Sequence, residues 1–177
     1  SGDNVWCQGY SEPNAGSDLA SLRTRAAREG DEWVLNGQKV WTTYANQADY
    51  CMFLVRTDPN APQHKGISCL IVPLRTPGVT VRPLREMTGD TDFNEVFLDN
   101  ARVPADSVVG EVNKGWSHIL STLNNERILV AAMCTGILRG VIEEAVKYAT
   151  ERVAFGKKIA EFQVINHWIA DMQMRLM

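Results

Sequence analysis

The 177-residue sequence lacks the features of several protein classes. Its net charge is only −3, and its basic runs are short, with three cations in residues 152–158, so nucleic-acid binding is not expected. No apolar run reaches the roughly 18 residues that span a membrane. The four cysteines form no CxxC pair and the three histidines are scattered, which argues against a metal site.

The sequence also has too few cysteines for a small disulfide-rich secreted domain. Its first residues, Ser1-Gly2-Asp3-Asn4, are polar and acidic and show no signal-peptide pattern. We therefore expect reduced thiols in a reducing compartment.

Before residue 112 the sequence has the pattern of short strands separated by turns. Asn36-Gly37 lies between the apolar and β-branched segments 32–35 and 38–43, which predicts a hairpin with a type I′ turn. Further strands are expected at residues 50–57, 66–73, 79–84 and 94–98. Many short strands with turns between them favour a small barrel or sandwich.

After Gly110 the apolar residues follow a helical period. No proline occurs from Gly115 to about Glu151, and apolar residues recur every three or four positions, which predicts one helix of about 35 residues. Gly136 and Gly140 inside it each cost about 1 kcal/mol relative to alanine, so they indicate either close helix packing or simple tolerance. Residues 153–158 form a break.

A second helix is expected from about Ile159 to the end of the sequence. Its apolar face would hold Phe162, Ile165, Trp168, Ile169 and Met172. Two helices with broad apolar faces cannot bury them against each other alone. We therefore expect the chain to be part of a larger protein or to need partner subunits.

Three segments in this order resemble a known family: YSEPNAGSDLASLRTRA at 10–26, WVLNGQKVWTTYA at 33–45, and ERVAFGKKIAEFQ at 151–163. Together they are similar to the acyl-CoA dehydrogenase family of flavoproteins, over essentially the whole chain. The resemblance implies an α+β fold, with an antiparallel β-barrel domain at residues 1–112. Residues 113–177 would be two long α-helices of a partial four-helix bundle.

The family resemblance implies FAD-dependent α,β-dehydrogenation of an acyl-CoA thioester. A glutamate removes the α-proton, the β-hydride moves to flavin N5, and the electrons pass to an electron-transfer flavoprotein. It also implies a role in fatty acid β-oxidation, a homo-oligomer (a dimer or a homotetramer), and a location in the bacterial cytoplasm or the mitochondrial matrix. The base must be a desolvated carboxylate, because the α-proton is only weakly acidic.

The flavin residues follow from the same resemblance. Trp41 would pack against the ring, the Thr43 hydroxyl would bond near N5, and Ser11 would bond the pyrimidine edge. Strand alternation places Trp41 and Thr43 on the same side. Gly16 and Ser17 would lie beside the acyl-CoA.

Three further FAD contacts are implied near the break between the helices. Arg152 would bind the pyrophosphate of a neighbouring subunit's FAD, a task that suits its planar, permanently charged fork. Phe155 would pack near the adenine end, and Gln163 would be an additional contact.

The catalytic base has three interpretations. A branch resembling isovaleryl-CoA and long-chain acyl-CoA dehydrogenases carries it on the first long helix before an arginine, where this sequence has Glu126-Arg127. Other family members place it in a late loop beyond this chain. Glu126 could also be an ordinary surface carboxylate.

Two other functions remain open at the level of sequence. A relative of the same fold could use the flavin with oxygen, as an acyl-CoA oxidase or a monooxygenase does, or the chain could be an inactive fragment. The intact Glu126-Arg127 pair and Trp41-x-Thr43 motif favour the dehydrogenase. The acyl chain length and branching are not encoded in any motif that we recognise.

Overall fold

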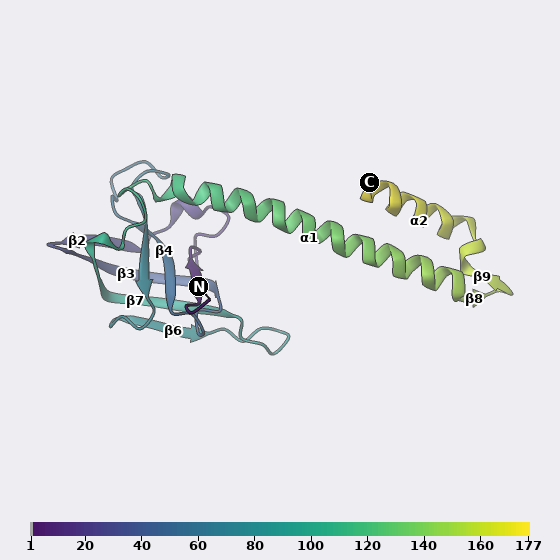
Figure 1. Ribbon diagram of the computed structural model, residues 1–177, viewed down its shortest axis with the longest axis horizontal. Coiled ribbons are helices and arrows are strands. Elements are labelled where there is room, and N and C mark those ends of the chain that lie inside the picture. The colour runs from purple at the N-terminus through teal and green to yellow at the C-terminus, as the bar shows by residue number, and fades with distance from the viewer. Residues whose placement is uncertain (1) are drawn as a thin grey trace. The chain divides into compact units, whose positions relative to one another are not determined.

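The computed structural model describes residues 2–177, which divide into two compact units. The first unit ends at Ser121 and the second spans Thr122–Met177. In the first unit the strands curl into an open half-barrel, and the second unit is helical (Figure 1). The expected α+β class, a β-domain followed by two helices, is confirmed.

Seven strands make up the sheet of the first unit. They are β1 (Trp6–Gly9), β2 (Arg25–Glu29), β3 (Glu32–Thr43), β4 (Tyr50–Arg56), β5 (Ile67–Pro73), β6 (Val79–Pro83) and β7 (Phe93–Pro104). Their order is β1-β4-β2-β3-β7-β6, with β5 paired to β4. Most ladders are antiparallel, as expected, but β4 pairs in parallel with both β1 and β2.

The core of the half-barrel comes from alternating residues of these strands. Most apolar side chains of β4 and β5 are buried, and β4 has strand partners on both of its edges. Phe53 has no exposed surface and packs with Leu35, Val72 and Val96. Two short 3-10 helices accompany the sheet: Leu19–Ser21 lies between β1 and β2, and Ala105–Ser107 follows β7.

The predicted hairpin at Asn36-Gly37 is wrong. β3 runs uninterrupted through both residues, and the hairpin turn lies earlier, at Gly30-Asp31 between β2 and β3. The Asn36 side chain bonds Asn100 instead, which lies in a bulge of β7. Gly37 is needed because a Cβ there would lie 2.7 Å from the Thr24 Cα. The dipeptide therefore serves packing within the sheet. Its local sequence does not distinguish this role from that of a hairpin turn.

The second unit contains most of the long helix α1 (Gly115–Glu151) and the helix α2 (Gln163–Leu176). Between them lie a two-stranded ribbon, β8 (Val153–Ala154) and β9 (Lys157–Lys158), and the 3-10 helix Ile159–Glu161. The expected break is thus a hairpin. Its turn residues, Phe155 and Gly156, both have positive φ, as a type I′ turn requires. The second α-helix also begins later than the expected Ile159.

The second unit buries little by itself. Of its apolar side chains only Ile142 and Ala149 are buried, whereas large ones along α1 and α2 are exposed. An added Cβ at Gly136 or Gly140 would meet nothing within 4 Å, so neither glycine serves close packing within this chain.

Candidate functional site

Trp41 and Thr43 lie at the end of β3, where the strand is irregular. Val40 and Trp41 stand opposite the single residue Glu95 of β7, which is a β-bulge. Trp41 takes φ 61°, a conformation that is strained for a bulky side chain by on the order of 1 kcal/mol. The bulge leaves Trp41 61% exposed, and Thr43 is also exposed while Thr42 between them is buried.

Asn94 of β7 holds this irregular strand end in place. Its side-chain Nδ2 donates to the Thr42 carbonyl at 3.0 Å and to the Asp92 carbonyl at 3.2 Å. Asn94 is fully buried, and its Oδ1 and the Thr42 hydroxyl have no partner within the described residues. A buried amide bonded to a strand carbonyl fixes the backbone from which Trp41 and Thr43 project.

A cavity of about 470 Å³ opens beside the Trp41 ring. It is bounded by the loop of residues 84–88 and by Phe93, whose ring meets Trp41 edge-on at 6.0 Å between centroids. Met87 on this loop is fully exposed. The site therefore offers a flat aromatic face with room next to it.

Ser11 reaches the same region through the backbone. The Val40 N–H donates to the Ser11 carbonyl at 2.9 Å, so the half-buried Ser11 lies against the residue that precedes Trp41. Glu12 and Ala15 close a tight turn by donating to each other's carbonyls at 2.9 and 3.1 Å. This turn projects Gly16 and Ser17 into solvent.

Gly16 and Ser17 are exposed. A glycine in a turn often serves a positive φ or a close approach of the backbone to another group. Within the chain neither occurs: its φ is not in the positive range, and an added Cβ would meet nothing within 4 Å. Any requirement for glycine at this position comes from a ligand or from another part of the protein.

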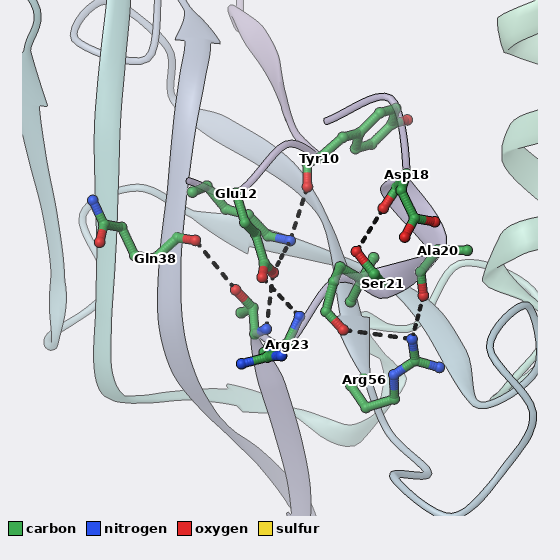
Figure 2. A network of polar contacts seen from close by, with 11 residues as sticks. Tyr10, Glu12, Asp18, Ala20, Ser21, Arg23, Gln38 and Arg56 are labelled. Atoms are coloured by element: carbon green, nitrogen blue, oxygen red, sulfur yellow. Dashed lines mark hydrogen bonds and ion pairs between the residues drawn. The ribbon is translucent and has the colours of Figure 1, made fainter. Parts of the chain in front are cut away.

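A buried ion pair joins Glu12 of this loop to Lys39 of β3, and sequence reasoning missed it. Figure 2 shows the polar contacts around Glu12. The Lys39 Nζ donates to Glu12 Oε1 at 2.8 Å and to the Tyr10 carbonyl at 3.0 Å. The Glu12 carboxylate also accepts the backbone N–H groups of Arg23 at 2.7 Å and Thr24 at 2.8 Å. The sequence did contain a signal for this burial. Trp33 and Leu35 face inward, and because side chains alternate along a strand, Lys39 falls on the same inward face.

Burial and charge shift the pKa values of this pair. Burial lowers the pKa of Lys39 to about 8, although the nearby Glu12 and Cys51 oppose this. Burial raises the pKa of Glu12, but Lys39 and the N–H donors outweigh it and hold that pKa below its usual value of 4.5. Both groups are therefore mainly charged at neutral pH.

Glu126 and Arg127 lie on α1 in the second unit. Glu126 is half-buried and Arg127 is exposed, with its Nη1 donating to Asn124 Oδ1 at 3.0 Å. Both border an open groove of about 430 Å³, whose other lining residues Leu123, Val130 and Ala131 are apolar. The helix thus presents a carboxylate within an apolar surface.

Arg152 and Phe155 belong to the ribbon region of the second unit, and Gln163 follows it at the start of α2. Arg152 follows the last residue of α1, and its carbonyl accepts the Ile159 N–H at 2.9 Å. Phe155 sits at the tip of the turn and is 97% exposed, and Gln163 begins α2. A cation, an aromatic ring and an amide thus lie within twelve residues of one another along the chain.

No three metal-ligating side chains gather anywhere in residues 2–177. No helix in that range is both long and apolar enough to cross a membrane.

Comparison with known proteins identifies both units. The description "Acyl-CoA dehydrogenase, middle domain" matches residues 7–101, and "Acyl-CoA dehydrogenase, C-terminal domain" matches residues 113–177. The chain is 56% identical over 147 residues to the acyl-CoA dehydrogenase FadE34 of Mycobacterium tuberculosis, covering 82% of this chain and 20% of that protein. It is 40% identical over 179 residues to the human short-chain specific acyl-CoA dehydrogenase, mitochondrial, covering 99% and 43%.

A solved structure described as "Tcur3481-Tcur3483 steroid ACAD" is also similar. It superposes with a TM-score of 0.86 at 41% identity and covers 99% of this chain and 44% of that one. The chain thus spans less than half the length of each of these three relatives.

Proposed function

The chain belongs to the acyl-CoA dehydrogenase family, and we propose that it forms part of an FAD-dependent enzyme that dehydrogenates an acyl-CoA thioester between Cα and Cβ. The proposal concerns a protein in which further segments of the family fold accompany this chain, since the relatives are more than twice as long. The observation that carries it is the geometry at the end of β3. There a strained bulge exposes the Trp41 ring beside Thr43 and Ser11.

These residues fit an isoalloxazine ring, which has flat apolar faces and a polar edge. Trp41 offers a ring face with an adjoining cavity, and the Thr43 and Ser11 hydroxyls are donors at the same strand end. FAD, when bound, supplies a hydride acceptor for the β-carbon. Asn94 and the bulge keep Trp41 and Thr43 oriented, so little reorganisation is needed when the ring binds.

Glu126 is the proposed base. A carboxylate oxygen of Glu126 takes the α-proton of the thioester, and Arg127 orients the site or the ligand. The apolar neighbours Leu123, Val130 and Ala131 would exclude water once the groove is covered. A carboxylate in a dry groove is a stronger base than one in water, which the weakly acidic α-proton requires.

Arg152, Phe155 and Gln163 are proposed to contact the FAD of a neighbouring subunit. Their exposure supports this, since all three side chains are accessible to a second subunit and the Phe155 ring is 97% exposed. A homodimer or homotetramer follows from a shared cofactor. We further propose that the electrons pass to an electron-transfer flavoprotein, in β-oxidation in the bacterial cytoplasm or the mitochondrial matrix.

The experiment compares the full-length protein with its Glu126→Gln variant. Each is mixed anaerobically with a panel of acyl-CoA thioesters of different length and branching, including a steroid acyl-CoA because one similar structure is described as a steroid ACAD. The wild type should lose its visible flavin absorption with at least one thioester. The variant should bind FAD normally but turn over about 10²–10⁴ times more slowly, since it lacks the base. Glu143→Gln, an exposed carboxylate on the same helix, should behave like the wild type.

Three results would change the proposal. If the wild type bound FAD but no thioester bleached it, the dehydrogenase function would be wrong. If Glu126→Gln turned over normally, the base would lie outside this chain. Rapid reoxidation of the reduced protein by oxygen, rather than by an electron-transfer flavoprotein, would indicate an oxidase of the same fold.

A further inference from the structure

The buried Glu12–Lys39 pair is the least expected feature of the first unit. Lys39 has no exposed surface and Glu12 is only 9% exposed. Each charge loses several kcal/mol of hydration on burial, and apolar residues of similar size would often serve stability equally well. What a buried, fully bonded ion pair supplies is a fixed geometry, because its partners have only one good arrangement.

The partners of this pair come from separate parts of the chain. Lys39 belongs to β3, while Tyr10 and Glu12 belong to the loop after β1, and Arg23 and Thr24 directly precede β2. Figure 2 shows the Glu12 carboxylate directed toward Arg23, whose backbone N–H it accepts. One side chain, Lys39, thereby ties the loop to the sheet.

Ser11 lies in the middle of this arrangement. The carbonyl of Tyr10 before it accepts from Lys39, the side chain of Glu12 after it accepts from Lys39, and its own carbonyl accepts from the Val40 N–H. Two consecutive β3 residues thus hold three consecutive loop residues. The next residue of β3 is Trp41, so the same contacts fix Ser11 relative to the exposed ring.

We propose that Lys39 is a positioning residue for the flavin site, which acts through Glu12 and the Tyr10 carbonyl to hold Ser11 in register with Trp41. This inference rests on the proposed function, because it requires that Ser11 and Trp41 face FAD. Lys39 itself touches neither the cofactor nor the substrate, since it is enclosed by the loop and the sheet.

The groups that face the pair are consistent with this role. Cys51 of β4 lies near Lys39, and Arg56 of β4 lies near Glu12. The Arg56 guanidinium is itself bonded to the carbonyls of Ala20 at 2.6 Å and Leu22 at 3.4 Å. Arg56 therefore holds the far end of the same loop, and among residues 2–177 Lys39 is the cationic side chain that donates to Glu12.

The test measures FAD binding to the full-length protein with variants K39M, E12Q and E12Q/K39M. Readouts are the FAD dissociation constant, the visible absorption of the bound flavin, and the melting temperature without FAD. The control is V103A, a core truncation at the far end of β7, opposite Trp33, which destabilises the half-barrel without touching the loop.

We expect K39M and E12Q each to raise the FAD dissociation constant by about tenfold or more and to alter the flavin absorption, since Ser11 loses its support. V103A should lower the melting temperature but leave the dissociation constant within about threefold. Because Glu12 and Lys39 act as one unit, the FAD dissociation constant of the double variant should be no higher than the higher of the two single-variant values. E12Q/K39M also buries no unpaired charge, so it should fold if K39M does not.

Wild-type FAD affinity in the folded double variant would overturn the inference. So would single effects that multiply in the double variant, because independent residues do not form a clamp. So would a loss of affinity in V103A equal to that in K39M, which would make FAD binding a simple reflection of stability. If the wild type itself did not bind FAD, the proposed function would fail first.

Discussion

Phe53 in the middle of β4 and Ile137 within α1 are both large apolar residues, yet Phe53 is fully buried and Ile137 is 64% exposed. The first unit, which contains Phe53, has one continuous core to which buried apolar side chains of several strands contribute. The second unit, which contains Ile137, buries only Ile142 and Ala149 among its apolar side chains. The half-barrel therefore has a core of its own, whereas the helices leave most of their large apolar side chains uncovered within the second unit.

The difference extends to charge. The first unit encloses a lysine and a glutamate that bond to each other, whereas no ionisable side chain of the second unit is buried. Two of the relatives are more than twice as long as this chain. Their additional length is consistent with further segments that cover α1 and α2. The two units thus differ in their sensitivity to mutation, pH and partners.

The largest expected contrast is between truncations of Phe53 and Ile137. In this chain alone, Phe53→Ala should lower the free energy of unfolding by about 3–5 kcal/mol, because it leaves a cavity in a closed core. Ile137→Ala should change it by less than about 0.5 kcal/mol. Urea denaturation followed by circular dichroism measures both. Equal effects would show that the second unit has a core of its own.

An intermediate effect is expected from alkaline pH on the first unit. The folded chain loses the Lys39 proton near pH 8 and the unfolded chain near 10.5, so between these values the unfolded chain binds more protons. The contribution of Lys39 to the free energy of unfolding therefore rises with pH, by on the order of a few kcal/mol. Melting curves from pH 7 to 10 should show the wild type gaining stability relative to E12Q/K39M. A constant difference between the two proteins would contradict the pKa of Lys39.

The smallest contrast uses two glycines. Gly37→Ala should destabilise the chain by roughly 1–3 kcal/mol, because its Cβ would collide with the Thr24 backbone. Gly136→Ala should stabilise helix α1 by up to about 1 kcal/mol, because nothing lies near the new methyl group. The melting temperature of this chain, compared between wild type and each variant, measures both changes in stability. The same Gly136 substitution in the full-length protein sharpens the comparison: a loss of stability there would identify Gly136 as a contact point for a covering helix.

Much of the fold was accessible from sequence because its signals are local. The strands β4, β5 and β6 and the extent of α1 follow from apolar periodicity, and the structure confirms them within one residue. Asn36-Gly37 was misread because the dipeptide has the same propensity in a turn as beside a bulge. β1 and β2 were not anticipated, since each is short and carries polar residues along its length.

The site was accessible in a different way. Trp41, Thr43, Ser11 and the helix residues were selected by family resemblance, and their roles remain predictions. Asn94 and Lys39 have no distinctive local pattern. They acquire meaning only through the atoms that they touch on strands and loops distant in sequence.

The sequence by itself determined the order of the elements, their apolar faces and the family, since each depends on residues a few positions apart. Only the tertiary structure decided that Lys39 meets Glu12, 27 residues away, that Trp41 adopts a strained bulge, and that the hairpin turn lies at Gly30. The physical reason is that burial, charge pairing and strand register are properties of contacts between distant segments. No local pattern encodes such contacts, and they are settled when the sheet closes around its core.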